Sequence, residues 1–263
     1  MKQRLWFLGS AILVQLGLLA VWEIAVLALR VPSYMLPGPG TVAKVAMARL
    51  PSLIHSLLLS AEAAVIGLVA SIVAGVAIAL VFAQWRWARR LLFPYTILLQ
   101  TVPIIAIAPL IIMWVGPGLS SVALVTFIIC LAPIIVNTTQ GLISVDKNLL
   151  DLFLMHKATG AQVLFKLRLP HALPNLFTGI RIASGIAVIG AITGELFAGS
   201  SRVGEGGLGY AILYANSQLE TDYLFALVAA ATVLGFAFFF VTMFVEWWFL
   251  HEWHESNRSD VSE

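Results

Sequence analysis

The chain has 263 residues, of which 60% are hydrophobic and only 11% are charged, and its mean hydropathy is +0.98. Soluble domains carry about 25% charged residues, so the composition excludes a soluble protein and indicates an integral membrane protein. The net charge of +2 is too small to suggest a nucleic-acid partner. The single cysteine, Cys130, can form no internal disulfide and is expected to pack inertly.

The first apolar run extends from Leu5 to Leu29, after Lys2 and Arg4. It is longer than the roughly 7–15 residues of a signal-peptide core, so we expect a retained first membrane span. Glu23 lies near the far end of this run, where we expect it to be anchored at the membrane interface beside Trp22.

Residues 30–56 are rich in proline and glycine and predict an external stretch of turns, with a short amphipathic segment over 42–50. The second span is expected over Leu57–Ala83, with one face of small residues for close helix contact: Gly67, Ala70, Ser71, Ala74 and Gly75. Glu62 either hydrogen-bonds a neighbouring helix or lines a transport path, and the sequence favours neither alternative.

A basic loop with two tryptophans, residues 84–90, is expected on the cytoplasmic side. The apolar region 91–115 that follows contains three prolines. Because lipid cannot replace the backbone hydrogen bonds that proline breaks, this third span should be buried among other helices or line a cavity. The prolines and the polar pair expected at the break are Pro94, Pro103, Pro109, Gln100 and Thr101.

A minimal external turn, Gly116-Pro117-Gly118, precedes the fourth span, which we expect over Leu119–Val136 with a kink at Pro133. The polar residues 137–140 that follow predict solvated capping at a helix end, with contact to a substrate as the alternative. The fifth span is expected over Leu176–Phe197.

The stretch 199–210 is rich in glycine, but it is not a phosphate cradle, because no Gly-Lys-Ser or Gly-Lys-Thr follows. The last span is expected over Leu224–Leu250. His251 and His254 in the tail lack the His-Glu-x-x-His spacing, so no metal site is expected.

The longest polar insertion, residues 146–181, carries five basic residues. We expect two short amphipathic helices hinged at Gly160, where glycine would take the left-handed conformation without strain. The second helix should stop near Leu169-Pro170, because proline disfavours helix in the preceding residue. A short piece should then lead to Pro174. Taken alone, such a loop is a cytoplasmic connector whose charges fix topology.

The order of residues in this insertion resembles the signature loop of permease subunits in binding-protein-dependent ABC importers. The residues that carry the resemblance are Gly160-Ala161, Phe165, Leu169-Pro170, Pro174 and Gly179-Ile180-Arg181. The Glu-Ala-Ala triplet for which the loop is named is replaced here by Leu154, Met155 and His156. Other stretches are similar to the same family: Gln100-Thr-Val-Pro103, Ala108-Pro109-Leu110, Trp114-Val-Gly116, Asn137-Thr138 followed by Gly141, and Glu195 followed by Gly207-Leu-Gly-Tyr210.

The resemblance implies an all-α integral membrane fold: six transmembrane helices of a type I (MetI-like) importer permease, with cytoplasmic coupling helices between the fourth and fifth spans. We divide the chain into an N-terminal span with an external segment (1–55), the transmembrane domain (56–250) and a cytoplasmic tail (251–263). Implied partners are a second copy of the permease, two copies of an ATP-binding subunit, an extracytoplasmic substrate-binding protein and membrane lipid. ATP and Mg²⁺ would be bound by the partner subunit, and no cofactor is expected in this chain.

Three sets of candidate residues follow, none of them catalytic. The ATPase-coupling set is Asp151, Phe153, His156, Lys157, Gly160, Ala161, Phe165, Lys166, Arg168, Leu169, Pro170 and Pro174. The translocation-path set is Gln100, Thr101, Pro103, Pro109, Asn137, Thr138 and Glu195. The outer-gate set, where the binding protein would dock, is Gly199, Ser200, Gly207, Gly209 and Tyr210.

The resemblance implies a bacterial inner membrane. The charge distribution favours both termini being cytoplasmic, because most of the 15 Lys and Arg residues then lie on the cytoplasmic side. The basic residues left outside are Arg30, Lys44, Arg49 and Arg202.

The stretches 101–141 and 166–170 are similar to the nitrate, sulfonate and taurine permease group. Within it we favour a riboflavin or thiamine-precursor permease, with a nitrate-, sulfonate- or taurine-type permease as the alternative. An ion-coupled secondary carrier, from another class, would need mid-membrane charges and inverted repeats, and no clear repeat is found. An intramembrane hydrolase would need a nucleophile beside a membrane-embedded base, whereas His55, His156 and His171 lie outside the expected spans.

Overall fold

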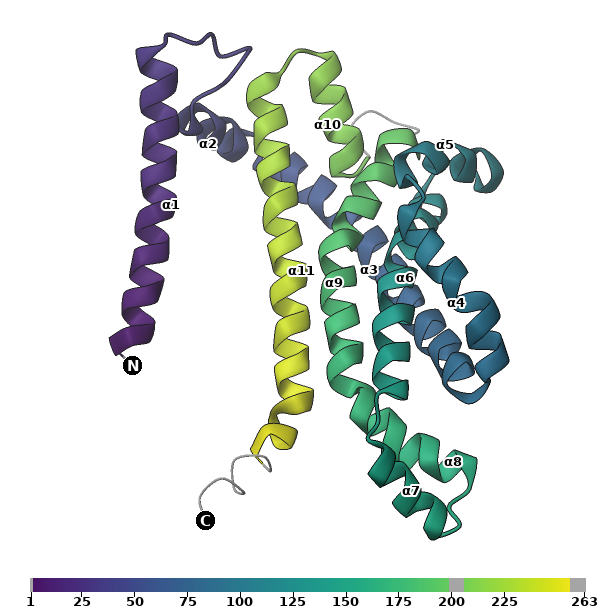
Figure 1. Cartoon of the computed structure of the whole chain (residues 1–263). Helices are drawn as coiled ribbons and strands as arrows, with labels where there is room; N and C mark the ends of the chain where they lie inside the picture. The colour runs from purple at the N-terminus through teal and green to yellow at the C-terminus, as the bar shows by residue number, and fades with distance from the viewer. Residues whose placement is uncertain (1, 199–205, 256–263) are drawn as a thin grey trace.

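The computed structural model describes residues 2–198 and 206–255, and every element in these ranges is a helix (Figure 1). In chain order the elements are α1 (Lys2–Ala28), α2 (Pro39–Ala48), α3 (Leu50–Gln84), α4 (Arg86–Thr101), α5 (Ile104–Val115), α6 (Leu119–Ile143), α7 (Lys147–Met155), α8 (Gly160–Val163), the π-helical turn η1 (Leu164–Arg168), α9 (Leu169–Ala198), α10 (Leu208–Ser217) and α11 (Thr221–Glu255).

Four helical segments of the described chain are long and apolar enough to cross a membrane: Leu50–Gln84, Leu119–Ile143, Gly160–Ala198 and Thr221–His251. The pair α4 and α5 makes a fifth span if the two helices, bent by 100° against each other, are counted together. In α1 the described apolar segment, Leu13–Ala28, is shorter. The multi-span, all-helical architecture is therefore confirmed, whereas the number six stays a prediction.

The centre of the bundle is α6, packed between α3 and α9 (Figure 1). Small residues permit this contact, because an added Cβ at Gly67 would overlap Thr126 and one at Gly75 would overlap Ile134. Close approach matters in lipid, where helix association depends on packing. The predicted small-residue face of α3 is confirmed at Gly67, Ser71 and Gly75, which are buried, whereas Ala74 is half-buried and Ala70 is exposed. Glu62 is exposed as well.

Helix α1 stands apart from the bundle and is joined to it through α2 (Figure 1). Its best contacts are at the corner with α2, where the Glu23 carboxylate accepts a hydrogen bond from the Gly40 N–H at 3.3 Å. This carboxylate therefore lies at the N-terminus of α2, where the helix dipole favours negative charge. Trp22 packs beside the Phe225 ring of α11, with centroids 5.9 Å apart.

Two ion pairs tie α11 to the rest of the chain. Arg49 pairs with Glu220 at the corner between α10 and α11, with Arg49 Nη2 2.8 Å from Glu220 Oε1, and its guanidinium lies 4.7 Å from the Tyr223 ring centroid. The Arg49 hydrogen bond holds the pKa of the Glu220 carboxyl below its ordinary value. Arg181 of α9 pairs with Glu246 of α11, its Nε donating to Glu246 Oε2 at 3.0 Å.

The predicted end of the fourth span is wrong. Helix α6 does not end at Val136 but runs to Ile143, so that residues 137–140 lie inside a helix and are not capping groups. Pro133, where the sequence predicts a kink, lies inside α6. The helix continues past it because proline removes only one hydrogen bond of the turn, and the neighbouring α3 and α9 hold the helix in place. The expected inert packing of Cys130 is confirmed, since it is fully buried and its thiol donates to the Ala183 carbonyl at 3.4 Å.

Candidate functional site

The polar insertion forms a connector that protrudes from one end of the bundle and contains α7, α8 and η1 (Figure 1). Helix α7 begins where Asp146 accepts a hydrogen bond from the Asn148 N–H at 2.7 Å. It ends at Met155, and Lys157, two residues further on, has a φ of 54°. The Lys157 N–H then donates to Leu154 O and the Ala158 N–H to Phe153 O, the pattern of a Schellman motif.

The prediction that Gly160 is the left-handed hinge is therefore wrong. Lys157 takes that conformation, and Gly160 is the first residue of α8. Thr159 and Gln162 start this helix with a reciprocal capping box, Thr159 N–H to Gln162 Oε1 at 2.8 Å and Gln162 N–H to Thr159 Oγ1 at 3.3 Å. A Cβ at Gly160 would meet no atom of the described chain within 4 Å. The fold itself does not require glycine there.

The predicted stop at Leu169-Pro170 is also wrong, and so is the separate piece before Pro174. The chain widens into the π-helical turn Leu164–Arg168, in which the Leu169 N–H donates to Leu164 O, and then continues as α9 through both prolines. A π turn shifts the hydrogen-bond register, so a proline just after it need not break the helix. As a result, Gly160–Ala198 is one continuous helical segment from the connector into the bundle.

The connector presents an exposed surface in which apolar and basic groups are mixed. Met155 is 80% exposed and Phe165 is 61% exposed. Large apolar side chains exposed together on a polar loop are typical of a surface that binds a partner. A groove of about 300 Å³ runs beside them and is lined by Leu152, Phe153, His156, Ala158, Gln162 and Lys166. The exposed members of the predicted coupling set are Asp151, His156, Lys157, Gly160, Ala161, Phe165, Lys166 and Pro174, while Phe153, Arg168, Leu169 and Pro170 are half-buried.

A second feature is the break between α4 and α5. The chain turns by 100° at Val102-Pro103, and the turn leaves a cavity of about 310 Å³. The cavity is lined by Leu99, Gln100, Val102, Ile104, Ile107, Ile128, Ile129, Pro133 and Ile186. Because the lining residues of α6 and α9 lie near the middle of those helices, the cavity is at mid-height in the bundle. Of the two predicted alternatives, burial among other helices or the lining of a cavity, the break shows the second.

The predicted path residues are only partly brought together. Gln100 lines the cavity and Pro103 makes the break, but the Thr101 hydroxyl donates to Leu98 O of its own helix at 2.8 Å. Pro109 and Asn137 do not line it. Further along α6, Thr138 and Thr139 are each 1% exposed, and their hydroxyls have no hydrogen-bond partner among the described residues.

Glu195 lies in a three-helix junction and not on an open path. Its side chain is 6% exposed, and Oε2 accepts hydrogen bonds from Ser60 Oγ and from the Gly209 N–H, both at 2.8 Å. Ser60 Oγ in turn accepts from the Leu208 N–H at 2.8 Å. Helix α10 begins at a glycine that offers no side-chain cap, so Glu195 of α9 and Ser60 of α3 cap it from outside.

The Gly-Leu-Gly sequence is explained by this junction. A Cβ at Gly207 would overlap the Glu195 carboxylate, and one at Gly209 would overlap the Ile192 carbonyl. Tyr210 stacks on Tyr214 with ring centroids 6.4 Å apart. Gly199 and Ser200 of the predicted outer-gate set lie outside the described residues. Ser60 was missed by sequence reasoning, because no local pattern marks a serine whose partner is 135 residues away.

No group of three potential metal ligands occurs in the described part of the chain. His251 is within that part, whereas the side chains of the rest of the tail cluster are not described.

Residues 67–250 match a family model described as "Binding-protein-dependent transport system inner membrane component". The chain therefore belongs to this family of ABC importer permeases, which are multi-pass membrane proteins and transport components. The matched region runs from the middle of α3 to the end of the last span and includes the connector, the α4/α5 break and the Glu195 junction.

Three relatives show how the family divides by substrate. The formylaminopyrimidine transport permease protein ThiX of Halalkalibacterium halodurans is 34% identical over 221 residues, which cover 84% of this chain and 86% of the relative. The riboflavin transport system permease protein RibX of Chloroflexus aurantiacus is 33% identical and covers 82% and 80%. The taurine transport system permease protein TauC of Escherichia coli is 28% identical and covers 88% and 86%. Their substrates differ, so the comparisons show the class of transporter and not its solute.

Proposed function

We propose that this chain forms the solute path of an ATP-driven importer, and that a substrate-binding protein outside the inner membrane delivers the solute. A thiamine-precursor pyrimidine or riboflavin is the favoured solute, because the relatives named for these compounds are 34% and 33% identical and the taurine permease is 28% identical. Nitrate, taurine or another sulfonate is the alternative.

The observation that carries the proposal is the continuous helical segment Gly160–Ala198. One end belongs to the exposed connector, and the other end carries Glu195, which holds α10. We assign the connector to the cytoplasmic side, where two ATP-binding subunits that hold ATP and Mg²⁺ grip α7 and α8. A displacement of the connector then moves the opposite end of α9 as a rigid body.

The α4/α5 break is the proposed place where the solute crosses. A broken helix in the membrane leaves backbone groups that must be satisfied within protein or a water-filled cavity, and transporters place binding sites at such breaks. Gln100 supplies a side-chain amide to this cavity. The hydroxyls of Thr138 and Thr139, which have no partner among the described residues, could hydrogen-bond the solute further along α6 when this helix and its neighbours separate.

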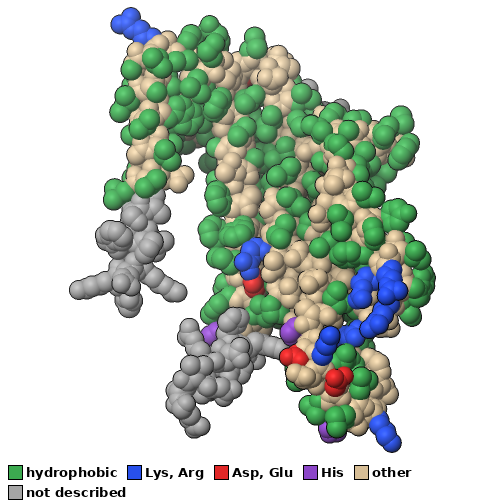
Figure 2. Space-filling view, viewed as in Figure 1, with side chains coloured by type: hydrophobic (Ala, Val, Ile, Leu, Met, Phe, Trp, Pro, Cys, Tyr) green, Lys and Arg blue, Asp and Glu red, His purple; other side chains and the backbone are tan. Residues whose placement is uncertain are grey.

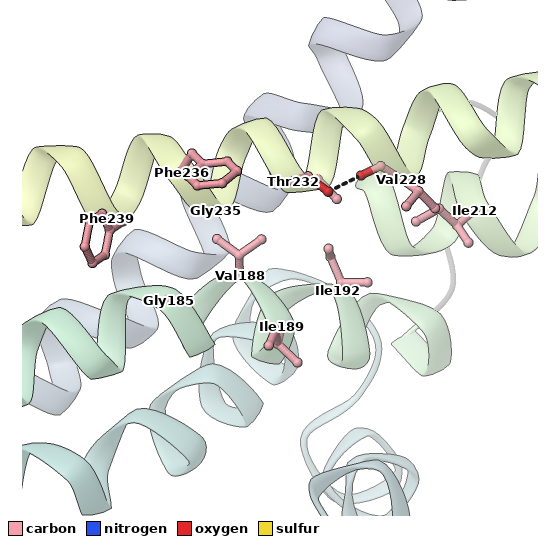
Figure 3. Close-up of a pocket in the computed structure, with 11 residues that line it drawn as sticks. Gly185, Val188, Ile189, Ile192, Ile212, Val228, Thr232, Gly235, Phe236 and Phe239 are labelled. Carbon is pink, nitrogen blue, oxygen red and sulfur yellow. Dashed lines mark hydrogen bonds between the residues drawn. The ribbon is translucent and has the colours of Figure 1, made fainter. Parts of the chain in front are cut away.

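A homodimer is supported by an uncovered apolar hollow of about 620 Å³ between α9, α10 and α11 (Figure 3). Figure 3 shows Val188, Ile192 and Phe236 lying around it. At Gly185 and Gly235, on facing helices, a Cβ would meet nothing in the described chain within 4 Å. An apolar groove with room at two glycines fits a helix of a second copy, and two permease copies would enclose one path.

The test is reconstitution of the permease with the ATP-binding subunit in proteoliposomes. ATP-dependent uptake, together with ATPase stimulation by a binding protein loaded with riboflavin or a formylaminopyrimidine but not with taurine, is the expected result. Uptake that needs no ATP-binding subunit would instead identify a secondary carrier and overturn the proposal.

A further inference from the structure

Four arginines from two distant segments gather at the connector end of the bundle. In Figure 2, Lys and Arg side chains collect beside the lower ends of α4 and α8, below a belt of apolar side chains. We call Arg86, Arg89, Arg90 and Arg168 the basic patch. Arg86 and Arg90 are exposed, and Arg89 and Arg168 are half-buried.

The patch is held in shape but its charge is not neutralised. Arg168 Nη1 donates to Ala83 O, in the last turn of α3, at 2.8 Å, and this fixes the guanidinium beside the α3–α4 corner. Arg86 and Arg89 are close enough for their charges to repel that of Arg168. The ion pairs of the described residues, Arg49–Glu220 and Arg181–Glu246, do not involve the patch. Several like charges fixed together favour an anionic ligand.

The surroundings of the patch are those of a membrane interface. Trp85 is 50% exposed and Trp87 is 64% exposed, on either side of Arg86. Tryptophan is enriched at the level of lipid headgroups. Beyond the arginines, α4 continues with large apolar side chains that are all exposed: Leu91, Leu92, Tyr95 and Leu98. Helix α4 thus has positive charge at its first turn and an exposed apolar face over the turns that follow.

We infer that the basic patch binds the phosphate of an anionic phospholipid whose acyl chains lie along the exposed face of α4. Basic pockets between transmembrane helices hold anionic headgroups in this way. A carboxylate of a protein partner would match the charge alone, but it would leave the apolar face of α4 without an occupant. The site depends on the chain spanning a membrane and not on the identity of the solute.

The experiment uses the full-length chain purified in detergent, with lipid binding counted by native mass spectrometry. The probes are phosphatidylglycerol, phosphatidylcholine with the same acyl chains, and inorganic phosphate. The test variant is Arg86→Gln/Arg89→Gln. Its matched control is Lys44→Gln, which removes an exposed positive charge on α2.

Wild type and Lys44→Gln should bind phosphatidylglycerol more tightly than phosphatidylcholine. The double variant should lose about fivefold of that preference per arginine, or about 25-fold in all. Arg89→Lys keeps the charge and should retain most of the preference. It separates the loss of charge from any structural effect of replacing this arginine.

Equal binding of the two lipids by wild type would overturn the inference, as would a double variant that keeps the full preference. Equal occupancy by inorganic phosphate would show a free-phosphate site in place of a lipid site. If the double variant loses the ATP-binding subunit and yet keeps its lipid preference, the patch faces that protein and the inference is wrong.

Discussion

The glycines of the α10 junction and the glycine of the connector have opposite surroundings. At Gly207 and Gly209 the backbone of α10 approaches Glu195 and the Ile192 carbonyl so closely that no side chain fits. At Gly160, on the connector, a Cβ would point into open space within the described chain. Both belong to stretches that resemble the same permease family. The comparison teaches that the fold requires glycine at the α10 junction but not at Gly160 on the connector.

The largest effect is expected from Gly209→Ala. The added methyl group would overlap the Ile192 carbonyl and push the N-terminus of α10 away from Glu195, so we expect overpacking to cost about 1–3 kcal/mol and the loss of the capping hydrogen bonds to add to it. Thermal unfolding and gel filtration in detergent measure the change. The control is Gly160→Ala, where the methyl group has room and lies outside the proposed dimer groove. Equal stability of the two variants would contradict the close approach.

Replacement of Glu195 tests the same junction from the other side. Glu195→Ala leaves the Ser60 O–H and the Gly209 N–H without an acceptor and should cost about 1–3 kcal/mol of unfolding free energy. Glu195→Gln keeps an acceptor oxygen and should cost less. If the two variants unfold at the same temperature, the carboxylate does not cap α10.

The exposed ion pair Arg49–Glu220 should contribute less to stability than the buried Glu195 junction. Because its folded pKa is depressed, the Glu220 carboxylate contributes stability at pH values above its unfolded pKa, about 4.3, and loses that contribution as the pH falls through its lower folded value. Glu220→Gln should therefore be less stable than wild type at pH 7 by about 0.2–1 kcal/mol. Unfolding curves between pH 7 and pH 3 should converge, and a gap that widens in acid would contradict the assignment.

Gly160→Pro should have the smallest effect on stability. Proline is favoured at the first position of a helix, and Thr159 before it is already extended, with φ −70° and ψ 158°. We expect a change within about 0.5 kcal/mol in thermal unfolding. A large loss of folded protein would show that Gly160 is the hinge after all, and would contradict the assignment of that conformation to Lys157.

The sequence predicts the helical bodies well and their ends poorly. The cores of α3, α6 and α9 follow from long apolar runs, which only helices can carry across lipid. The end of α6 and the passage through Pro170 depend instead on neighbouring helices and on a π turn, which local proline and glycine rules do not contain. The left-handed turn after α7 is local, but a lysine occupies it, and the glycine rule does not predict that.

The candidate sites divide in the same way. The capping box of Thr159 and Gln162 follows a short-range pattern that could have been recognised in the sequence. The pairs Ser60–Glu195 and Arg49–Glu220 join residues 135 and 171 positions apart, and nothing local in the sequence marks them.

The central claim is that the connector is the surface gripped by the ATP-binding subunit, and co-purification of that subunit tests it most directly. Met155→Glu/Phe165→Glu places two charges on exposed apolar positions without disturbing the fold. The control is Leu219→Glu, at an exposed position between α10 and α11. We predict that the double variant is folded but retains no ATP-binding subunit, while the control retains a normal amount. A double variant that still carries the subunit at the level of wild type would contradict the account.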